Sequence, residues 1–331
     1  MKIPFPLLAA DIGGTNARFA LFAAPGAAPV ALPAQTTAAH ATFEAAVRAA
    51  LARAPAAPAS MLACAAGPVQ GRTVKLTNAD WLIDGLALAA ALDLEQGLLF
   101  NDFEAQALSI PALKPEWLRP IGAARAGAPG PRLIHGPGTG LGTAALVDAA
   151  GRWLAVASEA AHSNFAPGTA REIAFWPFVE RSHGRLTPET LISGPGMARL
   201  HRALARCDGL GAPDLQSGDI IARALADSGS READTVRAFW TLAARFAGDM
   251  ALAFVATGGV ILAGGILPRV LDLLDAAAFR ATFEDRAPYT EFARRIPVSA
   301  LVEKDTVLHG LAGVAAEPER YAIDYAARGW R

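Results

Sequence analysis

Short apolar runs separated by glycine-rich or polar turns fill the first hundred residues. The runs LLAAD (7–11) and RFALFA (18–23) enclose the turn IGGTNA and predict a β-hairpin. The segment TFEAAVRAALARA, from Thr42, has apolar residues at helical spacing and predicts a helix. The region continues with strands over MLACAAG (61–67), RTVKLTN (72–78) and GLLF (97–100) and a helix after an Asp84 cap. This alternation of strands and helices is typical of an α/β fold.

A second strand, glycine loop and strand follows a connection rich in glycine and proline (124–132). It consists of RLIH, GPGTG and LGTAALV, and it begins about 125 positions after the first hairpin. Two such hairpins predict a duplicated fold whose halves face one ligand. A third segment, GGVILAGGILPRVL, predicts a strand, a Gly264–Gly265 turn and a helix with Pro268 in its first turn.

The most apolar long segment, residues 235–259, predicts a helix rather than a membrane span. Arg237, Arg245 and Asp249 fall inside it, and the hydrocarbon core of a bilayer would penalise their charges. Its apolar residues recur at helical spacing, so we expect a helix with a buried face that ends at Gly258–Gly259.

Composition narrows the function classes. The 331 residues carry a formal net charge of −1, so no overall field attracts nucleic acid or an anionic membrane. Cys64 and Cys207 are the only cysteines, too few for a zinc cluster, and their number favours a reduced, cytoplasmic location. The run MKIPFPLLAAD contains two prolines and is interpreted as a first strand rather than a signal peptide.

Glycine loops allow backbone N–H groups to approach an anion such as phosphate. The loop GPGTGLG fits no register of G-x-G-x-x-G, and the sequence has no Gly-Lys pair for a P-loop. None of the four lysines lies beside a glycine loop; they are Lys2, Lys75, Lys114 and Lys304. We therefore expect backbone amides, hydroxyls and a metal to hold the phosphates.

An acid directly before a glycine turn suits a hydrated Mg²⁺ ion on a nucleotide, because Mg²⁺ keeps its waters and uses few carboxylates. Asp11 would bind the metal ion, and the backbone of Gly13, Gly14 and Thr15 would bind the phosphates. An ordinary glycine hairpin is the alternative, and the matching loops later in the chain weigh against it.

Seven motifs occur in one order along the chain: DIGGTNAR, LTNADW, LLFNDFEAQA, GPGTGLG, SEAAHSNFAP, ETLISGPG and GGVILAGGILPR. Together they resemble the bacterial glucokinase family, within the hexokinase, heat-shock-chaperone and actin clan. The resemblance runs from about Leu8 to Gly313. The chain lacks the cysteine-rich zinc motif of the related repressor/kinase group, so it is similar to the zinc-free branch.

The resemblance implies a role for each matching position. Asn101 and Asp102 match the sugar-binding and catalytic pair, with Asp102 as the general base. Further sugar contacts are implied for Thr139, Gly140, Glu159, His162 and Glu189. Nucleotide contacts are implied for Asp11, Gly13, Gly14, Thr15, Asn16, Gly138, Thr139, Gly264 and Gly265. Asp11 would reach Mg²⁺ on ATP through water.

Elementary chemistry agrees with these roles and leaves structural alternatives open. A carboxylate at the end of a buried strand can be aimed at a hydroxyl, yet Asp102 could instead cap the helix that starts near Phe103. His162 could be a packing histidine, and Glu189 could be a first-turn helix acid. Packing roles are expected for His40, His183 and His201.

One loop departs from the family pattern. The family has two glycines between its glutamate and histidine, whereas this chain has Ala160 and Ala161, and Asn164 replaces a common acid. Any backbone angle reserved for glycine would cost energy there. These changes bear on sugar identity and affinity more than on the type of reaction.

The resemblance implies a two-lobed actin-like ATPase (ribonuclease H-like) fold with a duplicated βββαβα-type core and a cleft between the lobes. We expect residues 1–112 and 303–331 in a small lobe and residues 113–302 in a large lobe.

The expected activity is ATP-dependent phosphorylation of D-glucose at the 6-hydroxyl, in a cytoplasmic homodimer implied by the resemblance. ATP and Mg²⁺ are the expected cofactors, without zinc, and neither nucleic acid nor a membrane is an expected partner. A kinase for another hexose is one alternative, because of Ala160–Ala161. A non-catalytic sugar- or nucleotide-sensing relative of actin is the other, and the sugar-type residues weigh against it.

Overall fold

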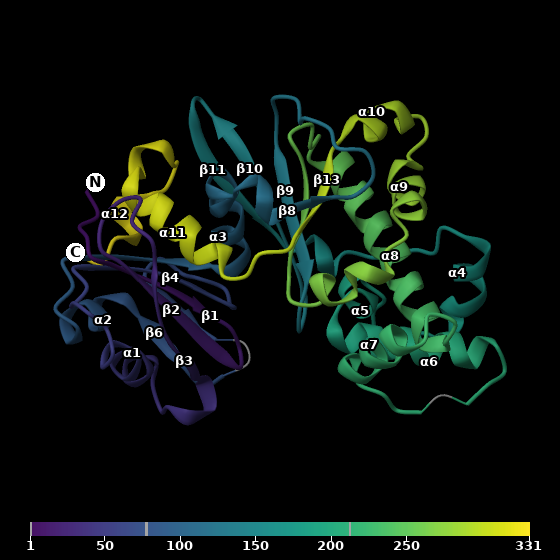
Figure 1. Ribbon diagram of the computed structural model, residues 1–331, viewed down its shortest axis with the longest axis horizontal. Coiled ribbons are helices and arrows are strands. Elements are labelled where there is room, and N and C mark those ends of the chain that lie inside the picture. Colours follow the sequence, from purple (N-terminus) through teal and green to yellow (C-terminus); the bar gives the residue numbers. More distant parts are fainter. Residues whose placement is uncertain (1, 77–78, 212) are drawn as a thin grey trace. The chain divides into compact units, whose positions relative to one another are not determined.

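The computed structural model of the chain describes residues 2–76, 79–211 and 213–331 (Figure 1). Thr77 and Asn78 of the LTNADW motif lie outside the described residues.

Internal contacts group the chain into two compact units. The first unit consists of residues 1–114, 146–157 and 303–331, and the second of residues 115–145 and 158–302. The lobes expected from the sequence differ from these units mainly over 146–157, which the contacts group with the first unit.

The sheet of the first unit contains the predicted first hairpin. Its strands are β1 (Leu7–Ile12), β2 (Asn16–Phe22), β3 (Val30–Thr36), β4 (Ser60–Ala65) and β7 (Gln96–Asn101), in the order β3-β2-β1-β4-β7. Strands β1 and β2 are antiparallel, with Leu7 opposite Phe22, which confirms the hairpin. Strand β4 is parallel to β1, and β7 is parallel to β4, so the carboxyl ends of these three strands share one edge.

Helices cover both faces of this sheet (Figure 1). One face carries α1 (Phe43–Leu51) and α2 (Gly85–Ala91), and the other carries α3 (Asp102–Ser109) and α11 (Thr306–Ala316). Thr42 caps α1 by accepting a hydrogen bond from the Ala45 N–H, and Asp84 caps α2 as predicted. The buried side chains of Phe43 and Val47 join the core beneath the sheet.

Short elements complete the first unit. They are η1 (Thr37–Ala39), the hairpin of β5 (Thr73–Lys75) and β6 (Leu82–Asp84), η2 (Ile110–Ala112), η7 (Pro318–Arg320) and α12 (Tyr325–Arg328). Strand β5 is shorter than the predicted strand over 72–78.

The second sheet repeats the strand order of the first. It contains β8 (Leu118–Pro120), β9 (Arg132–Pro137), β10 (Leu141–Ala149), β11 (Arg152–Ser158), β12 (Gly259–Leu262) and β13 (Val298–Leu301), in the order β11-β10-β9-β12-β13-β8. Numbered in chain order within each sheet, and without β8, the strands of both sheets have the order 3-2-1-4-5. Strand β12 is parallel to both β9 and β13. The predicted duplication is therefore confirmed.

Most helices of the second unit follow β11. One, η3 (Pro115–Trp117), precedes β8. The helices after β11 are η4 (Ala160–His162), α4 (Ala170–Phe175), η5 (Trp176–Phe178), α5 (Pro188–Leu191), α6 (Gly194–Cys207), α7 (Ser217–Ala226), α8 (Arg231–Ala253), η6 (Leu267–Leu273), α9 (Ala276–Glu284) and α10 (Thr290–Arg295). The segment after the Gly264–Gly265 turn is a 3-10 helix, η6, with a proline in its first turn.

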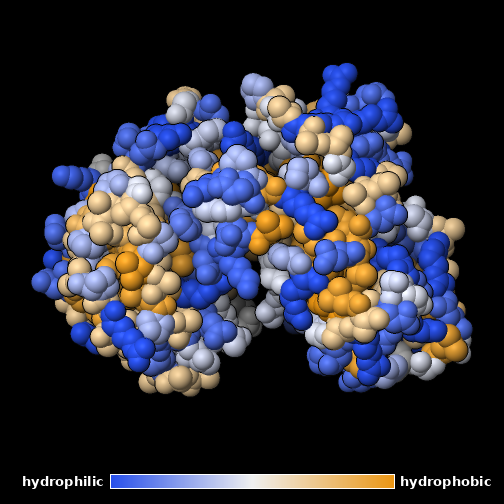
Figure 2. All heavy atoms as spheres, viewed as in Figure 1, coloured by the Kyte–Doolittle hydropathy of each residue, from blue (hydrophilic) through white to orange (hydrophobic). Residues whose placement is uncertain are grey.

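Helix α8 confirms the predicted long helix but not its end. It stops at Ala253, because Val255 adopts a left-handed conformation (φ 49°) before Gly258–Gly259 is reached. No helix within the described ranges is both long and apolar enough to cross a membrane. Figure 2 shows hydrophilic side chains spread over much of the visible face.

Candidate active site

The first glycine turn connects β1 to β2 at the carboxyl end of β1. The Gly13 N–H donates to the carbonyl oxygen of Asn16 at 2.9 Å, which closes the turn. The buried Thr37 holds it from the side, because its hydroxyl lies 2.9 Å from the carbonyl oxygen of Gly14 and 3.0 Å from that of Thr15. The backbone of the turn is therefore held in place by other parts of the first unit.

Asp11 lies at the start of this turn and has two polar partners, Arg18 and Cys64. Arg18 donates to one carboxylate oxygen at 2.6 Å and to Asp305 at 2.7 Å, and the Cys64 Sγ lies 3.4 Å from the other oxygen of Asp11. These partners were not predicted from the sequence. The hairpin register could have found Arg18, since it lies directly opposite Asp11 on β2.

Burial raises the pKa of the Cys64 thiol well above its ordinary value, and the charges of Asp11 and Asp102 raise it further. This thiol is therefore a neutral neighbour of the two carboxylates.

The β7–α3 junction carries the predicted catalytic pair. Asn101 caps α3: its side-chain oxygen accepts from the N–H groups of Phe103 and Glu104 at 3.0 and 3.2 Å, and its amide donates to the Gly67 carbonyl oxygen. The alternative that Asp102 is the cap is therefore wrong. Asp102 is the first residue of the helix, and one of its oxygens accepts from the Phe103 N–H at 2.9 Å.

Asp102 is in an environment that disfavours its charged form. Burial, and then the nearby negative charge of Asp11, raise its pKa from 3.8 to about 6, although the Phe103 N–H opposes this shift. The parallel register explains the proximity: Asp11 on β1 and Phe100 on β7 both pair with Cys64 on β4. A carboxylate with this pKa can accept a proton near neutral pH.

The second glycine turn connects β9 to β10 and is closely packed. The Gly138 N–H donates to the Gly140 carbonyl oxygen at 2.8 Å, and the Gly194 N–H donates to the Gly138 carbonyl oxygen at 2.9 Å. A Cβ on Gly136 would lie 2.1 Å from the carbonyl oxygen of Ala263, so only glycine fits there.

The predicted sugar residues of the second unit come together around this turn. The His162 ring lies 3.7 Å from a Glu159 oxygen through Nε2 and 3.9 Å from a Glu189 oxygen through Nδ1. Glu189 also accepts from the Leu141 N–H at 2.9 Å, and a Cβ on Gly140 would clash with it. Glu189 belongs to the first turn of α5, so it serves the helix and this cluster together.

The two alanines of the departing loop adopt right-handed backbone angles. Ala160 and Ala161 form η4 with His162, and neither has a positive φ. The expected strain of replacing glycine is therefore absent at these two positions. Ala161 is buried, whereas Glu159 and His162 are exposed.

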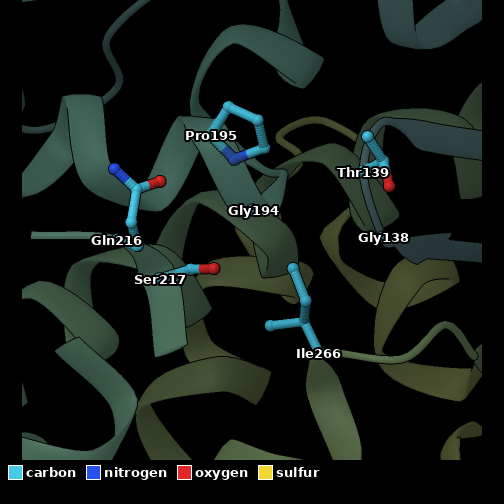
Figure 3. A pocket seen from close by; sticks show the side chains of 7 residues that line it. All are labelled: Gly138, Thr139, Gly194, Pro195, Gln216, Ser217 and Ile266. Atoms are coloured by element: carbon cyan, nitrogen blue, oxygen red, sulfur yellow. The ribbon is translucent and has the colours of Figure 1, made fainter. Parts of the chain in front are cut away.

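A pocket lies beside the second turn (Figure 3). Figure 3 shows Thr139 across from Gln216 and Ser217, at the start of α7, with Pro195 and Ile266 between them. The lining residues are Gly138, Thr139, Gly194, Pro195, Gln216, Ser217 and Ile266. Only Gly138 and Thr139 among them were predicted as site residues, because local sequence patterns do not indicate that α6 and α7 begin here.

The Gly264–Gly265 turn follows β12 and is exposed. Gly264 has φ 89°, and a Cβ there would lie 2.5 Å from the Pro137 carbonyl oxygen. This turn therefore packs against the second glycine turn. The predicted site residues thus form two groups, one in each unit.

Residues 8–318 match the family model described as Glucokinase. The chain belongs to the glucokinase family. It is accordingly an enzyme that phosphorylates glucose with ATP, which confirms the predicted activity.

Relatives match over nearly the full length. A glucokinase of Chelativorans sp. (strain BNC1) is 39% identical over 330 residues, which cover 99% of this chain and 96% of the relative. A glucokinase of Sinorhizobium medicae (strain WSM419) is 40% identical over 331 residues, covering 100% and 98%. The solved structure of a glucokinase from an Antarctic psychrotroph is 31% identical, with a TM-score of 0.82 and coverage of 94% and 99%. The predicted actin-like ATPase fold is confirmed.

Proposed function

We propose that this enzyme transfers the γ-phosphoryl group of ATP to the 6-hydroxyl of glucose, with Asp102 as the general base. The observation that carries the proposal is the placement of Asp102 on the first turn of α3, with a pKa raised to about 6. Phosphoryl transfer needs a positioned base and neutralisation of charge. An ionised Asp102 would accept the proton of the 6-hydroxyl while the hydroxyl oxygen attacks the γ-phosphorus. The bond from that phosphorus to the β–γ bridging oxygen breaks, and ADP leaves.

Asp11 fits a metal ion carried by the nucleotide better than a resident one. In the described part of the chain, no three acidic, histidine or cysteine side chains gather as a metal site. Mg²⁺ commonly uses one or two carboxylates and keeps several waters. When bound, ATP·Mg²⁺ supplies the phosphoryl group and a counter-charge, while Asp11 orients it and Arg18 holds Asp11 in place.

The glycine turns are the proposed phosphate contacts. In the first turn these are the backbone groups of Gly13, Gly14, Thr15 and Asn16; in the second, Gly138 and Thr139. The adenosine is proposed to lie in the pocket next to the second turn and Gly264–Gly265, where Ile266 offers an apolar surface. Helices α6 and α7 both begin at this pocket, and helix N-termini favour anions.

Glucose is proposed to contact Asn101 in the first unit and Thr139, Gly140, Glu159, His162 and Glu189 in the second. Carboxylates, an amide and an imidazole are suitable partners for a ring of hydroxyl groups. The close grouping of Glu159, His162 and Glu189 supports this assignment.

Another hexose remains the second candidate substrate, because Ala161 places a buried methyl group in the loop of Glu159 and His162. Comparing kcat/KM for glucose, mannose, fructose and N-acetylglucosamine decides between them. Glucose should be preferred by at least tenfold.

We further propose that the enzyme is a cytoplasmic homodimer without nucleic-acid or membrane partners. Within each subunit, residues 1–112 and 303–331 would form one lobe and residues 113–302 the other. The free cysteines Cys64 and Cys207 and the net charge of −1 support the location and the partners. The oligomeric state follows from the family resemblance.

The substitution Asp102→Ala tests the proposed base. We expect kcat to fall by about 10²–10⁴, while calorimetry still detects binding of ATP·Mg²⁺ and of glucose. Turnover within a few-fold of the wild type would assign Asp102 a structural role.

A further inference from the structure

The C-terminal segment, residues 325–331, is packed against the strand that leads to Asp102. Trp330 is 1% exposed, and its backbone N–H donates to the Gly97 carbonyl oxygen at 3.1 Å. A Cβ on Gly97 would lie 2.0 Å from the indole, and one on Gly85 would lie 2.2 Å from it. Both glycines leave space for this ring, so the C-terminal segment is packed into the first unit.

Arg328 extends from this segment to the β7–α3 junction. Its Nη1 and Nη2 donate to the two carboxylate oxygens of Glu104, at 2.6 and 2.9 Å, a two-point pairing. Nη2 also donates to the Leu99 carbonyl oxygen at 2.6 Å, and the guanidinium lies 4.7 Å from the centre of the Phe100 ring. These contacts fall on both sides of Asn101–Asp102.

Glu104 links Arg328 to the backbone of the junction. Its Oε2 accepts from the Asn101 N–H at 3.3 Å, and Asn101 in turn accepts from the Glu104 N–H. The two residues form a capping box around Asp102. The side chains of Arg328 and Glu104 are only 19% and 17% exposed, so solvent screens their attraction less than that of a surface pair.

We propose that Arg328 is a positioning residue for phosphoryl transfer: by holding Glu104 and the Leu99 carbonyl, it fixes the junction that aims the Asp102 carboxylate. The inference rests on the proposed role of Asp102. A reacting group misplaced by roughly 1 Å can lose about 10² in rate. Without the guanidinium, the Glu104 carboxylate is partly buried and unpaired, and the junction relaxes around it.

The test compares Arg328→Gln with a matched control, Arg72→Gln. Arg72 ties the same segment through the carbonyl oxygens of Gly329 and Ala326, at 2.5 and 3.1 Å. The measurements are kcat, KM for ATP and for glucose, and Tm. Arg328→Gln should lower kcat at least tenfold with KM for ATP within twofold. Arg72→Gln should lower Tm and leave kcat within twofold.

A compensating variant separates positioning from simple destabilisation. Glutamine can replace glutamate in a capping box, so adding Glu104→Gln to Arg328→Gln removes the unpaired charge and keeps the cap. The double variant should recover at least threefold in kcat over Arg328→Gln. Equal losses of kcat in Arg328→Gln and Arg72→Gln would overturn the inference, because loosening the segment would then suffice.

Asp102→Ala, assayed in parallel, distinguishes the two proposals. An inactive Asp102→Ala together with an Arg328→Gln enzyme of unchanged kcat overturns the positioning role alone. Turnover in Asp102→Ala overturns the proposed base and this inference with it. Should Arg328→Gln not fold, Arg328→Lys serves: it keeps the charge but loses the two-point pairing. A threefold or greater fall in its kcat supports the inference, and an unchanged kcat overturns it.

Discussion

The two glycine turns come from equivalent positions of a duplicated sheet, yet their glycines serve different ends. In the first turn, a Cβ on Gly13 would meet only the Asn16 carbonyl oxygen, at an ordinary 3.4 Å. Near the end of β9, directly before the second turn, a Cβ on Gly136 would lie 2.1 Å from the Ala263 carbonyl oxygen. Packing therefore requires glycine at Gly136 but not at Gly13.

Their charges differ as well. Asp11 of the first turn is paired with Arg18 and lies close enough to Asp102 to raise its pKa. The second turn is held by backbone hydrogen bonds and by the Glu189 carboxylate on the Leu141 N–H. We infer that the first glycine turn and its neighbours contribute acid–base chemistry, whereas the second glycine turn contributes a shaped backbone surface.

The largest expected effect that separates the two turns is on folding. Gly136→Ala should lower the free energy of unfolding by more than about 3 kcal/mol, because backbone atoms of β9 and of the residue after β12 must move apart. Gly13→Ala should lower it by less than about 1 kcal/mol. Denaturant unfolding at 25 °C measures both values. Equal losses of stability in the two variants would contradict the claim that packing requires glycine at Gly136 but not at Gly13.

The charged form of Asp102 should lower the free energy of unfolding. At pH 8, Asp102→Asn should raise the free energy of unfolding by about 1–3 kcal/mol, since one pKa unit corresponds to about 1.4 kcal/mol. The folded state binds the proton more tightly than the unfolded chain, whose carboxyl keeps a pKa near 3.8. Relative to Asp102→Asn, the wild type should therefore lose stability as pH rises from about 4 to 6, and the two proteins should converge below pH 4.

Denaturant unfolding of both proteins between pH 4 and 8 measures this difference. An Asp102→Asn variant less stable than the wild type at pH 8 would mean that Asp102 stabilises the junction rather than straining it.

A smaller effect is expected at the open end of the second turn. A Cβ on Gly138 would meet no atom within 4 Å, so Gly138→Ala should fold normally but crowd the proposed phosphates. KM for ATP should rise about tenfold, equivalent to about 1.4 kcal/mol, with Tm unchanged. Gly211→Ala, at another open glycine, is the control and should leave KM unchanged. An unchanged KM for ATP in Gly138→Ala would remove this turn from the nucleotide site.

Much of the fold could be predicted because its signals are local. Alternating apolar runs, turn glycines and the Asp84 cap define the first hairpin and helix α2 from a few neighbouring residues each. The end of α8 could not be predicted, because Val255 adopts the left-handed conformation that glycine usually supplies.

The candidate site shows the same contrast between features that local sequence signals predict and features that they do not. Asp11 and Asp102 stand at strand ends and could be recognised there, whereas their surroundings depend on contacts between distant segments. Arg18 and Asp305 are 287 positions apart, and Arg328 and Glu104 are 224 apart. No periodicity in the sequence reports such pairs.

We propose that the Asp102 carboxylate must be ionised for the 6-hydroxyl of glucose to lose its proton. The Cys64 thiol beside it stays neutral, so Asp11, itself paired with Arg18, is the charge that sets the shift beyond burial. The most direct test is the pH dependence of kcat/KM for glucose at saturating ATP. We predict that kcat/KM is constant above about pH 6 and falls tenfold per pH unit below it. In Asp11→Asn this acidic fall should begin at a lower pH. A kcat/KM that stays constant from pH 5 to 8, or an acidic fall that Asp11→Asn does not shift, would contradict the account.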